Sequence, residues 1–302
     1  MSKPCSGVCA ISAGGDKSAT AMGIMEGIFN KAPERLERDI WCGISAGALL
    51  SSQMSQLESG TTTECVSVLE NLMSMRVDFV EPWSHTSSLL GFVYGALWHN
   101  SMFKPNLRKV VEPLWKDTQY KKLVVGASNM TSGSYEFFEN PPIDMVIASA
   151  SVPVVFPQVV FEGNSYCDGA LHHVIPIKEI KKYWNAGNLD IILCYPTDHA
   201  EFTKSNVPET RHELSGYVYK TLSEAIWNNM MNDLQELARY YSLDFDKVKN
   251  GGRFKYEDRE IRIYVPQKGM YLDFTKRNHQ ALHTMYNHGV EIASKVLCSD
   301  PV

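Results

Sequence analysis

The feature that most constrains this chain is a G-x-S-x-G pentapeptide, Gly43-Ile44-Ser45-Ala46-Gly47, between two apolar segments. The segment before it, Ile40-Trp41-Cys42, is typical of a buried strand, and the one after it carries apolar residues at helical spacing. A strand, a sharp turn and a helix in this order expose a serine hydroxyl at the tip of the turn, and the glycines leave room where strand and helix meet. We therefore predict that Ser45 is a nucleophile.

A second, glycine-rich turn lies nearer the start of the chain, between a predicted buried strand over residues 7–12 and a predicted helix over residues 19–29. Such a turn presents backbone amides to an anion. One interpretation is an oxyanion hole, in which the amides of Gly14 and Gly15 face a tetrahedral intermediate and Lys17 adds positive charge. The alternative is a tight strand-to-helix turn without chemistry.

Three classes of ligand are disfavoured. A phosphate-binding loop in the first turn would need glycines where this chain has Ile11 and Asp16. A net charge of −5 with scattered lysines and arginines argues against nucleic acid as a partner. His279 and His283 have the spacing of a zinc helix, but Gln280 stands where that motif needs glutamate, so we expect no metal.

Composition indicates one large α/β domain. The chain has 302 residues, of which 44% are hydrophobic. Its seven cysteines form no C-x-x-C pair, which is typical of buried thiols in a reducing compartment. We see neither a signal peptide nor a transmembrane run, and we expect a cytoplasmic protein that is at most peripheral at membranes.

Strands and helices alternate in the remainder of the chain. The patterns predict strands at residues 122–128, 134–138, 190–195 and 260–265, a hairpin at 158–167, and helices at 142–150, 176–184, 213–241 and 276–297. The hairpin leads directly into Asp168-Gly169-Ala170. A capping box also predicts a helix over residues 61–75. The nearly uncharged, apolar stretch 83–103 fits either a lid that meets lipid or an ordinary buried helix and loop.

Four elements in fixed order resemble the patatin-like phospholipase family. They are Gly14-Gly15-Asp16-Lys17, the Gly43–Gly47 pentapeptide, the segment Ala148-Ser149-Ala150-Ser151-Val152-Pro153-Val154-Val155-Phe156-Pro157, and Asp168-Gly169-Ala170. The resemblance covers about residues 5–195. Two positions of the glycine-rich loop depart from the family pattern, because Ala13 and Ser18 stand where glycines are usual.

The resemblance implies a three-layer α/β/α fold with a central, mostly parallel sheet. It implies a catalytic domain at residues 5–200, and we expect the mostly helical residues 201–302 to pack on the same domain. It further implies a Ser45–Asp168 dyad, an oxyanion hole of Gly14 and Gly15 supported by Lys17, and no cofactor. The expected partner is a phospholipid or other lipid ester, met in transient membrane contact. Whether an activating protein is needed stays open.

Two other functions remain as alternatives. An α/β-hydrolase esterase also uses G-x-S-x-G but relies on a catalytic histidine, and candidates such as His172 and His173 exist, although none stands in a motif for such a base. A catalytically silent storage or lipid-binding protein is the other alternative. The presence of Ser45, Asp168 and both loop glycines favours an enzyme.

Overall fold

A computed structural model describes residues 7–58, 107–108, 111–153, 156–206, 214–269 and 279–301. The predicted helix at 61–75 and the apolar stretch at 83–103 lie outside these residues. Within them, nine strands form one sheet in the order β5-β6-β3-β2-β1-β7-β9-β8, and β4 also pairs with β3. The strands are β1 (Gly7–Ile11), β2 (Ile40–Ile44), β3 (Lys122–Asn129), β4 (Ser134–Glu139), β5 (Val159–Phe161), β6 (Asn164–Asp168), β7 (Asn188–Ile192), β8 (Gly252–Tyr256) and β9 (Arg259–Tyr264).

The centre of the sheet is parallel and its margins are antiparallel. Strands β3, β2, β1, β7 and β9 run in one direction, whereas β4, β5, β6 and β8 form antiparallel pairs. All five residues of β1 are buried, as expected for a parallel strand that is covered on both faces. The carboxyl ends of β1 and β2 are therefore neighbours, and the two turns singled out in the sequence follow those ends.

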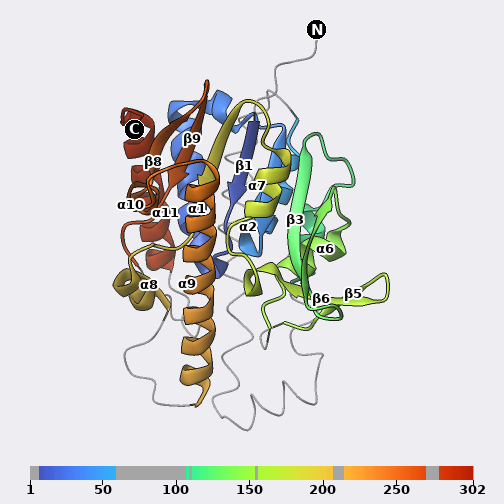
Figure 1. The fold of residues 1–302 in the computed structure, drawn as a ribbon. Coiled ribbons are helices and arrows are strands. Elements are labelled where there is room, and N and C mark those ends of the chain that lie inside the picture. The colour runs from blue at the N-terminus through green and yellow to red at the C-terminus, as the bar shows by residue number, and fades with distance from the viewer. Residues whose placement is uncertain are drawn as a thin grey trace.

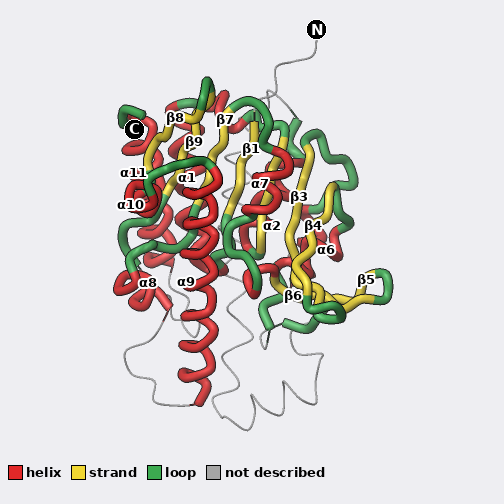
Figure 2. The backbone as a smooth tube through the Cα atoms, viewed as in Figure 1, coloured by secondary structure: helices red, strands yellow, loops and turns green. Residues whose placement is uncertain are grey.

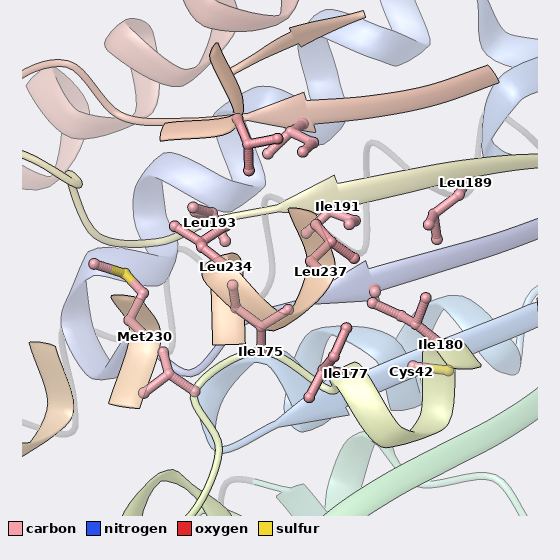
Figure 3. Close-up of a cluster of buried hydrophobic side chains, with 14 of the residues drawn as sticks. Cys42, Ile175, Ile177, Ile180, Leu189, Ile191, Leu193, Met230, Leu234 and Leu237 are labelled. Carbon is pink, nitrogen blue, oxygen red and sulfur yellow. The ribbon is translucent and has the colours of Figure 1, made fainter. Parts of the chain in front are cut away.

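Helices cover both faces of the sheet (Figures 1 and 2). One face packs against α7, α8, α9 and α10, and the other against α1, α2 and α11. Figure 3 shows part of the first core, where Met230, Leu234 and Leu237 of α9 lie among isoleucines and leucines. The helices are α1 (Ser18–Lys31), α2 (Ala46–Ser55), α6 (Ile143–Ser149), α7 (Ile177–Tyr183), α8 (His199–Asn206), α9 (Leu214–Tyr240), α10 (Phe245–Asn250) and α11 (His279–Cys298). The predicted three-layer α/β/α fold with a mostly parallel sheet is confirmed.

Helices α1 and α11 approach each other through glycines. A Cβ atom on Gly23 would lie 1.9 Å from the carbonyl oxygen of Tyr286, and one on Gly289 would lie 2.2 Å from that of Thr20. These distances are far inside van der Waals contact, so the backbones touch where side chains would normally separate them. The last described helix is thus built into the same layer as the first.

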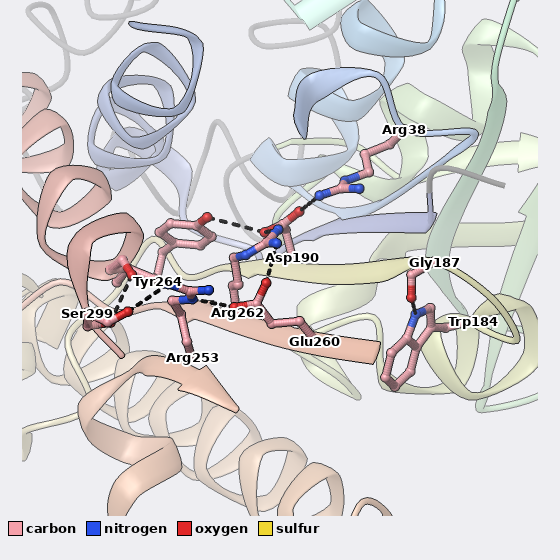
Figure 4. A network of polar contacts seen from close by, with 10 residues as sticks. Arg38, Trp184, Gly187, Asp190, Arg253, Glu260, Arg262, Tyr264 and Ser299 are labelled. Carbon is pink, nitrogen blue, oxygen red and sulfur yellow. Dashed lines mark hydrogen bonds and ion pairs between the residues drawn. The ribbon is translucent and has the colours of Figure 1, made fainter. Parts of the chain in front are cut away.

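A buried ionic network joins β7, β9 and the segment before β2 (Figure 4). Asp190 on β7 accepts hydrogen bonds from Arg38, from Arg262 (3.2 Å) and from the Tyr264 hydroxyl (3.2 Å). Arg262 also pairs with Glu260, which in turn binds Arg253. Each buried charge in this network has an opposite charge in contact, which is the usual condition for burying ions.

The predicted elements agree closely with the observed ones. The helix expected at 213–241 is α9, and the one expected at 276–297 is α11. Strand β8 and helices α8 and α10 were missed. Strand β8 begins at the second of two adjacent glycines and alternates Arg253 and Lys255 with aromatic residues, so its sequence resembles a polar loop. Its pairing with β9 makes it a strand. The predicted division of the chain at residue 200 stays a prediction.

Candidate active site

The turn at Ser45 has the geometry of a nucleophile turn. Ser45 joins β2 to α2 and has φ 58° and ψ −126°, a conformation that side chains other than glycine seldom adopt. A Cβ on Gly43 would lie 2.3 Å from the Gly47 carbonyl oxygen, and one on Gly47 would lie 2.3 Å from that of Ile11. The pattern of two glycines therefore follows from the close passage of backbone on both sides of Ser45.

The loop after β1 lies against the same turn. Gly47 is in contact with the carbonyl oxygens of both Ile11 and Ser12, so the nucleophile turn and the first residues of this loop touch. A Cβ on Gly14 would lie 2.1 Å from that of Cys194, and Gly15 adopts a positive φ of 48°. Gly14 thus leaves room for the Cys194 side chain, whereas Gly15 has open space where a Cβ would lie and is favoured only by its positive φ.

Lys17 and Ser18 complete this loop. Lys17 is buried, with 3% of its surface exposed, and its backbone amide donates to the Gly14 carbonyl (2.8 Å). The Ser18 hydroxyl donates to the Gly15 carbonyl (2.8 Å). Ser18, which stands where the resembled family has glycine, therefore caps the loop from within and leaves the two glycines in place.

Strand pairing brings Asp168 to the serine turn. On β3, Gly126 pairs with Ile44 of β2, and the next residue, Ala127, pairs with Asp168 of β6. A Cβ on Gly169 would lie 2.6 Å from the Gly126 oxygen and 2.9 Å from the Ile44 side chain. Residues about 120 positions apart in the chain thus meet across one intervening strand.

The Asp168 carboxyl is buried, and its pKa lies near neutral pH. Burial raises its pKa from 3.8 to about 7, and the Ser45 side chain and the Ala170 amide, as hydrogen-bond donors, oppose that rise. Oδ1 accepts from the Ala170 amide (2.8 Å), whereas the buried Oδ2 completes no hydrogen bond of good geometry with any described residue. Contacts between a nucleophile and its base are often loose before substrate binds. The serine hydroxyl is therefore close enough to the carboxylate to lower its pKa.

Ser149 is a site residue that sequence reasoning missed. Its hydroxyl accepts a hydrogen bond from the Ser45 amide (2.9 Å) and donates one to the Gly126 carbonyl (2.6 Å). It stands at the end of α6, inside the Ala148–Pro157 segment that carried part of the resemblance. The signal was present as a motif, but nothing in it indicated which residue the hydroxyl would bind.

The two histidines nearest Asp168 in sequence have other partners. Nδ1 of His172 contacts the Ser128 hydroxyl (2.9 Å), and that hydroxyl donates to the Asp168 carbonyl (2.9 Å). Nδ1 of His173 contacts the Asp233 carboxylate (2.6 Å). Neither of these two contacts involves Ser45. Among the described residues no three His, Cys, Asp or Glu side chains gather as metal ligands.

A glycine-flanked serine between a buried strand and a helix, in a three-layer α/β/α fold, is an arrangement typical of α/β hydrolytic enzymes. The model of the patatin-like phospholipase family matches residues 9–180, more than half of the chain. The chain therefore belongs to the patatin-like phospholipase family, whose members act on lipid substrates as acyl hydrolases. The resemblance inferred from the sequence is confirmed, and membership of the family suggests lipid acyl hydrolase activity.

Two further comparisons add little to this assignment. A crystal structure of VipD from Legionella pneumophila is similar at 12% sequence identity and a TM-score of 0.47, covering 98% of this chain and 67% of that one. No curated protein matches the chain. In the described part of the chain no helix is long and apolar enough to cross a membrane.

Proposed function

We propose that this protein hydrolyses carboxylic esters of lipids as a phospholipase A or lysophospholipase, using a Ser45–Asp168 dyad. One observation carries the proposal: a buried carboxyl with a pKa of about 7 adjoins a serine held at positive φ in a glycine-flanked turn. A serine hydroxyl is a poor nucleophile until a base removes its proton. Asp168 is the base that we assign to it.

The reaction runs in two halves. Ser45 Oγ attacks the ester carbonyl carbon while Asp168 Oδ2 takes the hydroxyl proton; the ester C–O bond then breaks and Asp168 returns the proton to the leaving alcohol. Water next attacks the acyl-enzyme with Asp168 again as base, which releases the fatty acid and restores the serine. A base with a pKa near the working pH can both take and return a proton, which this cycle requires.

The negative oxygen of each tetrahedral intermediate is assigned to the amides of Gly14 and Gly15. The contact of Gly47 with the start of this loop supports the assignment, because it holds the loop beside Ser45. Lys17, buried at the start of α1, supplies positive charge close to the loop. Removing one such donor typically lowers the rate by ~10²–10³.

Transient contact with a lipid surface is part of the proposal. Two apolar side chains, Met130 and Val160, are 45% and 73% exposed. Both adjoin Ser165, because the Met130 amide donates to its carbonyl (2.7 Å) and Val160 is its partner in the β5–β6 pair. Ser165 precedes Asp168 by three residues on β6. Val160 thus lies on the strand pair that carries the proposed base, and Met130, just after β3, lies beside that pair.

Labelling with a fluorophosphonate, together with product analysis on mixed phospholipid vesicles, tests the function. We expect a covalent adduct on Ser45, released fatty acid, and loss of both in Ser45→Ala. Asp168→Asn should abolish turnover, whereas His172→Ala and His173→Ala should each retain it. Loss of turnover in a histidine variant with retention in Asp168→Asn would establish the esterase alternative. A folded wild type that neither labels nor releases fatty acid would establish the silent alternative.

A further inference from the structure

Helix α9 belongs to the C-terminal third of the sequence, yet it binds the loop that follows Asp168. Its Asp233 is 2% exposed and accepts hydrogen bonds through Oδ2 from the amides of Val174 (2.7 Å) and Ile175 (2.9 Å). Its Oδ1 contacts Nδ1 of His173 (2.6 Å). A buried carboxylate is tolerated only with such partners, so these bonds fix the backbone of the loop to the helix.

A second polar side chain of α9 binds the same loop nearer Asp168. The side-chain Nδ2 of Asn229 donates to the carbonyl oxygens of Ala170 (3.1 Å) and Leu171 (3.0 Å). Asn229 and Asp233 are four residues apart, so they project from one face of the helix. The loop is therefore held at both of its ends by adjacent turns of α9.

Each of these contacts is one peptide away from the proposed machinery. Ala170, held by Asn229 through its carbonyl, donates its own amide to Asp168 Oδ1 (2.8 Å). Val174, held by Asp233 through its amide, accepts through its carbonyl from the amide of Ala13 (2.8 Å), the residue before Gly14. One face of α9 thus reaches the proposed base by one route and the oxyanion loop by the other.

Apolar packing keeps α9 from shifting. Met230 and Leu234, which directly follow Asn229 and Asp233 in sequence, are fully buried in the same core as Ile175. Figure 3 shows these side chains close together. Since a packed core deforms little, the helix holds Asn229 and Asp233 in fixed positions.

We propose that Asn229 and Asp233 are positioning residues that hold Asp168 and the Gly14–Gly15 loop in register. Helix α9 then has a role in the reaction although it contributes no group to the substrate. The proposal rests on the proposed function, in which Asp168 is the base and the glycine loop receives the oxyanion. It also predicts that the two sides of the site respond differently when each contact is removed.

Removing the Asn229 side chain should disturb Asp168 without unfolding the protein. In Asn229→Ala we expect kcat on phospholipid vesicles to fall about 10- to 100-fold with little change in KM, because misplacement of a catalytic group affects the chemical step. The matched control is Asn228→Ala, which removes an exposed asparagine from the neighbouring position of the same helix and should leave kcat unchanged. Equal kcat in wild type, Asn229→Ala and Asn228→Ala would overturn the proposal.

The carboxyl of Asp168 gives a readout that does not need activity. The Ala170 amide lowers the Asp168 pKa, so loosening that amide should raise it. A carbon-13 NMR titration of Asp168 should therefore show a higher midpoint in Asn229→Ala than in wild type and Asn228→Ala. An unchanged midpoint contradicts the positioning role. Because this measurement works in an inactive protein, it separates failure of the positioning role from failure of the proposed function.

Asp233 is tested by a graded pair of variants. Asp233→Asn keeps an oxygen that can accept from the Val174 and Ile175 amides, and it should retain most of kcat. Asp233→Ala leaves both buried amides without an acceptor and should lose kcat by at least the factor seen in Asn229→Ala. If Asp233→Ala fails to fold, Asp233→Asn still decides: hydrogen exchange at Val174 must stay slow, and fast exchange with full kcat would refute the role of Asp233.

Discussion

The backbone amide of Ser45 donates a hydrogen bond to the hydroxyl of Ser149, with an N–Oγ distance of 2.9 Å. Ser149 is fully buried and is itself tied to the Gly126 carbonyl. The peptide that carries the proposed nucleophile is thus fixed to α6 and β3 by one side chain. This bond accounts for how a residue at positive φ is kept in place.

Replacing Ser149 by alanine should loosen the nucleophile turn. The variant leaves the buried Ser45 amide without an acceptor, at a cost of about 1–3 kcal/mol in the free energy of unfolding. We also expect slower fluorophosphonate labelling of Ser45. Ser151→Ala is the control, since the Ser151 hydroxyl donates to the carbonyl of Ile147, four residues earlier, rather than to the Ser45 turn. Labelling at the wild-type rate in Ser149→Ala would show that the turn holds without this bond.

The rate of ester hydrolysis should depend on pH through Asp168. A base acts in its deprotonated form, and burial raises this pKa to about 7, so kcat/KM should rise with pH through about 7 and level off above it. Cys167 next to it has a pKa raised to about 12 by burial and stays neutral in this range. A pH–rate profile with its half-maximum near pH 4 would contradict the assignment of a buried base.

The glycines of the site should differ in what they tolerate. Gly47→Ala places a Cβ 2.3 Å from a backbone oxygen that cannot move aside, and we expect loss of labelling with strong destabilisation. Gly15→Ala meets open space and only the cost of positive φ, about 1–2 kcal/mol. Thermal unfolding midpoints of the two variants check the order. A Gly15→Ala protein less stable than Gly47→Ala would be the reverse of this prediction.

Replacing Glu179 by glutamine should stabilise the protein at alkaline pH, where the buried glutamate is charged. Burial raises the pKa of Glu179 to about 7, so between about pH 4.5 and 7 the folded protein binds more protons than the unfolded chain and loses stability as pH rises. Glu179→Gln removes this cost and should add roughly 1–3 kcal/mol at pH 8 and little at pH 4. The same difference in unfolding midpoint at both pH values would exclude ionisation as its cause.

The buried ionic network should be essential to stability. Asp190→Asn removes the negative charge that Arg38 and Arg262 share, at a cost of about 3–5 kcal/mol. Asp246→Asn is the control, because that carboxylate is 85% exposed in its ion pair with Lys249 and should contribute less than about 1 kcal/mol. Denaturant titration compares the two. Equal stabilities would show that water or another hydrogen-bond acceptor replaces the Asp190 carboxylate.

The sequence predicts those parts of the site in which local chemistry dictates local shape. The turn at Ser45 follows from two glycines between a buried strand and a helix, and the same residues proved to be in backbone contact. The hairpin that leads to Asp168 was predicted from alternation and turn residues, and it is β5 and β6. The order of these motifs along the chain resembles that of one family. That Ser45 and Asp168 lie close together in space was implied only by this resemblance.

The remaining site contacts depend on tertiary packing, which local patterns do not encode. Ser149 reaches Ser45 across 104 residues, and Asn229 reaches Ala170 across 59. From the sequence alone, an asparagine in a long amphipathic helix is expected to face solvent. Only its neighbours in space show that Asn229 binds a loop. For the same reason β8 was missed, because a short polar strand is defined by its partner in the sheet.

The glycine contacts between α1 and α11 have a consequence for synthesis. The Gly14–Gly15 loop leads directly into α1, and the helix that packs on its glycines, α11, is made only when the ribosome has reached residues 279–298. A nascent chain from which Ser45 and Asp168 have already emerged therefore has α1 without α11 packed against it. We therefore expect the Gly14–Gly15 loop of a nascent chain to become ordered only after α11 has been translated.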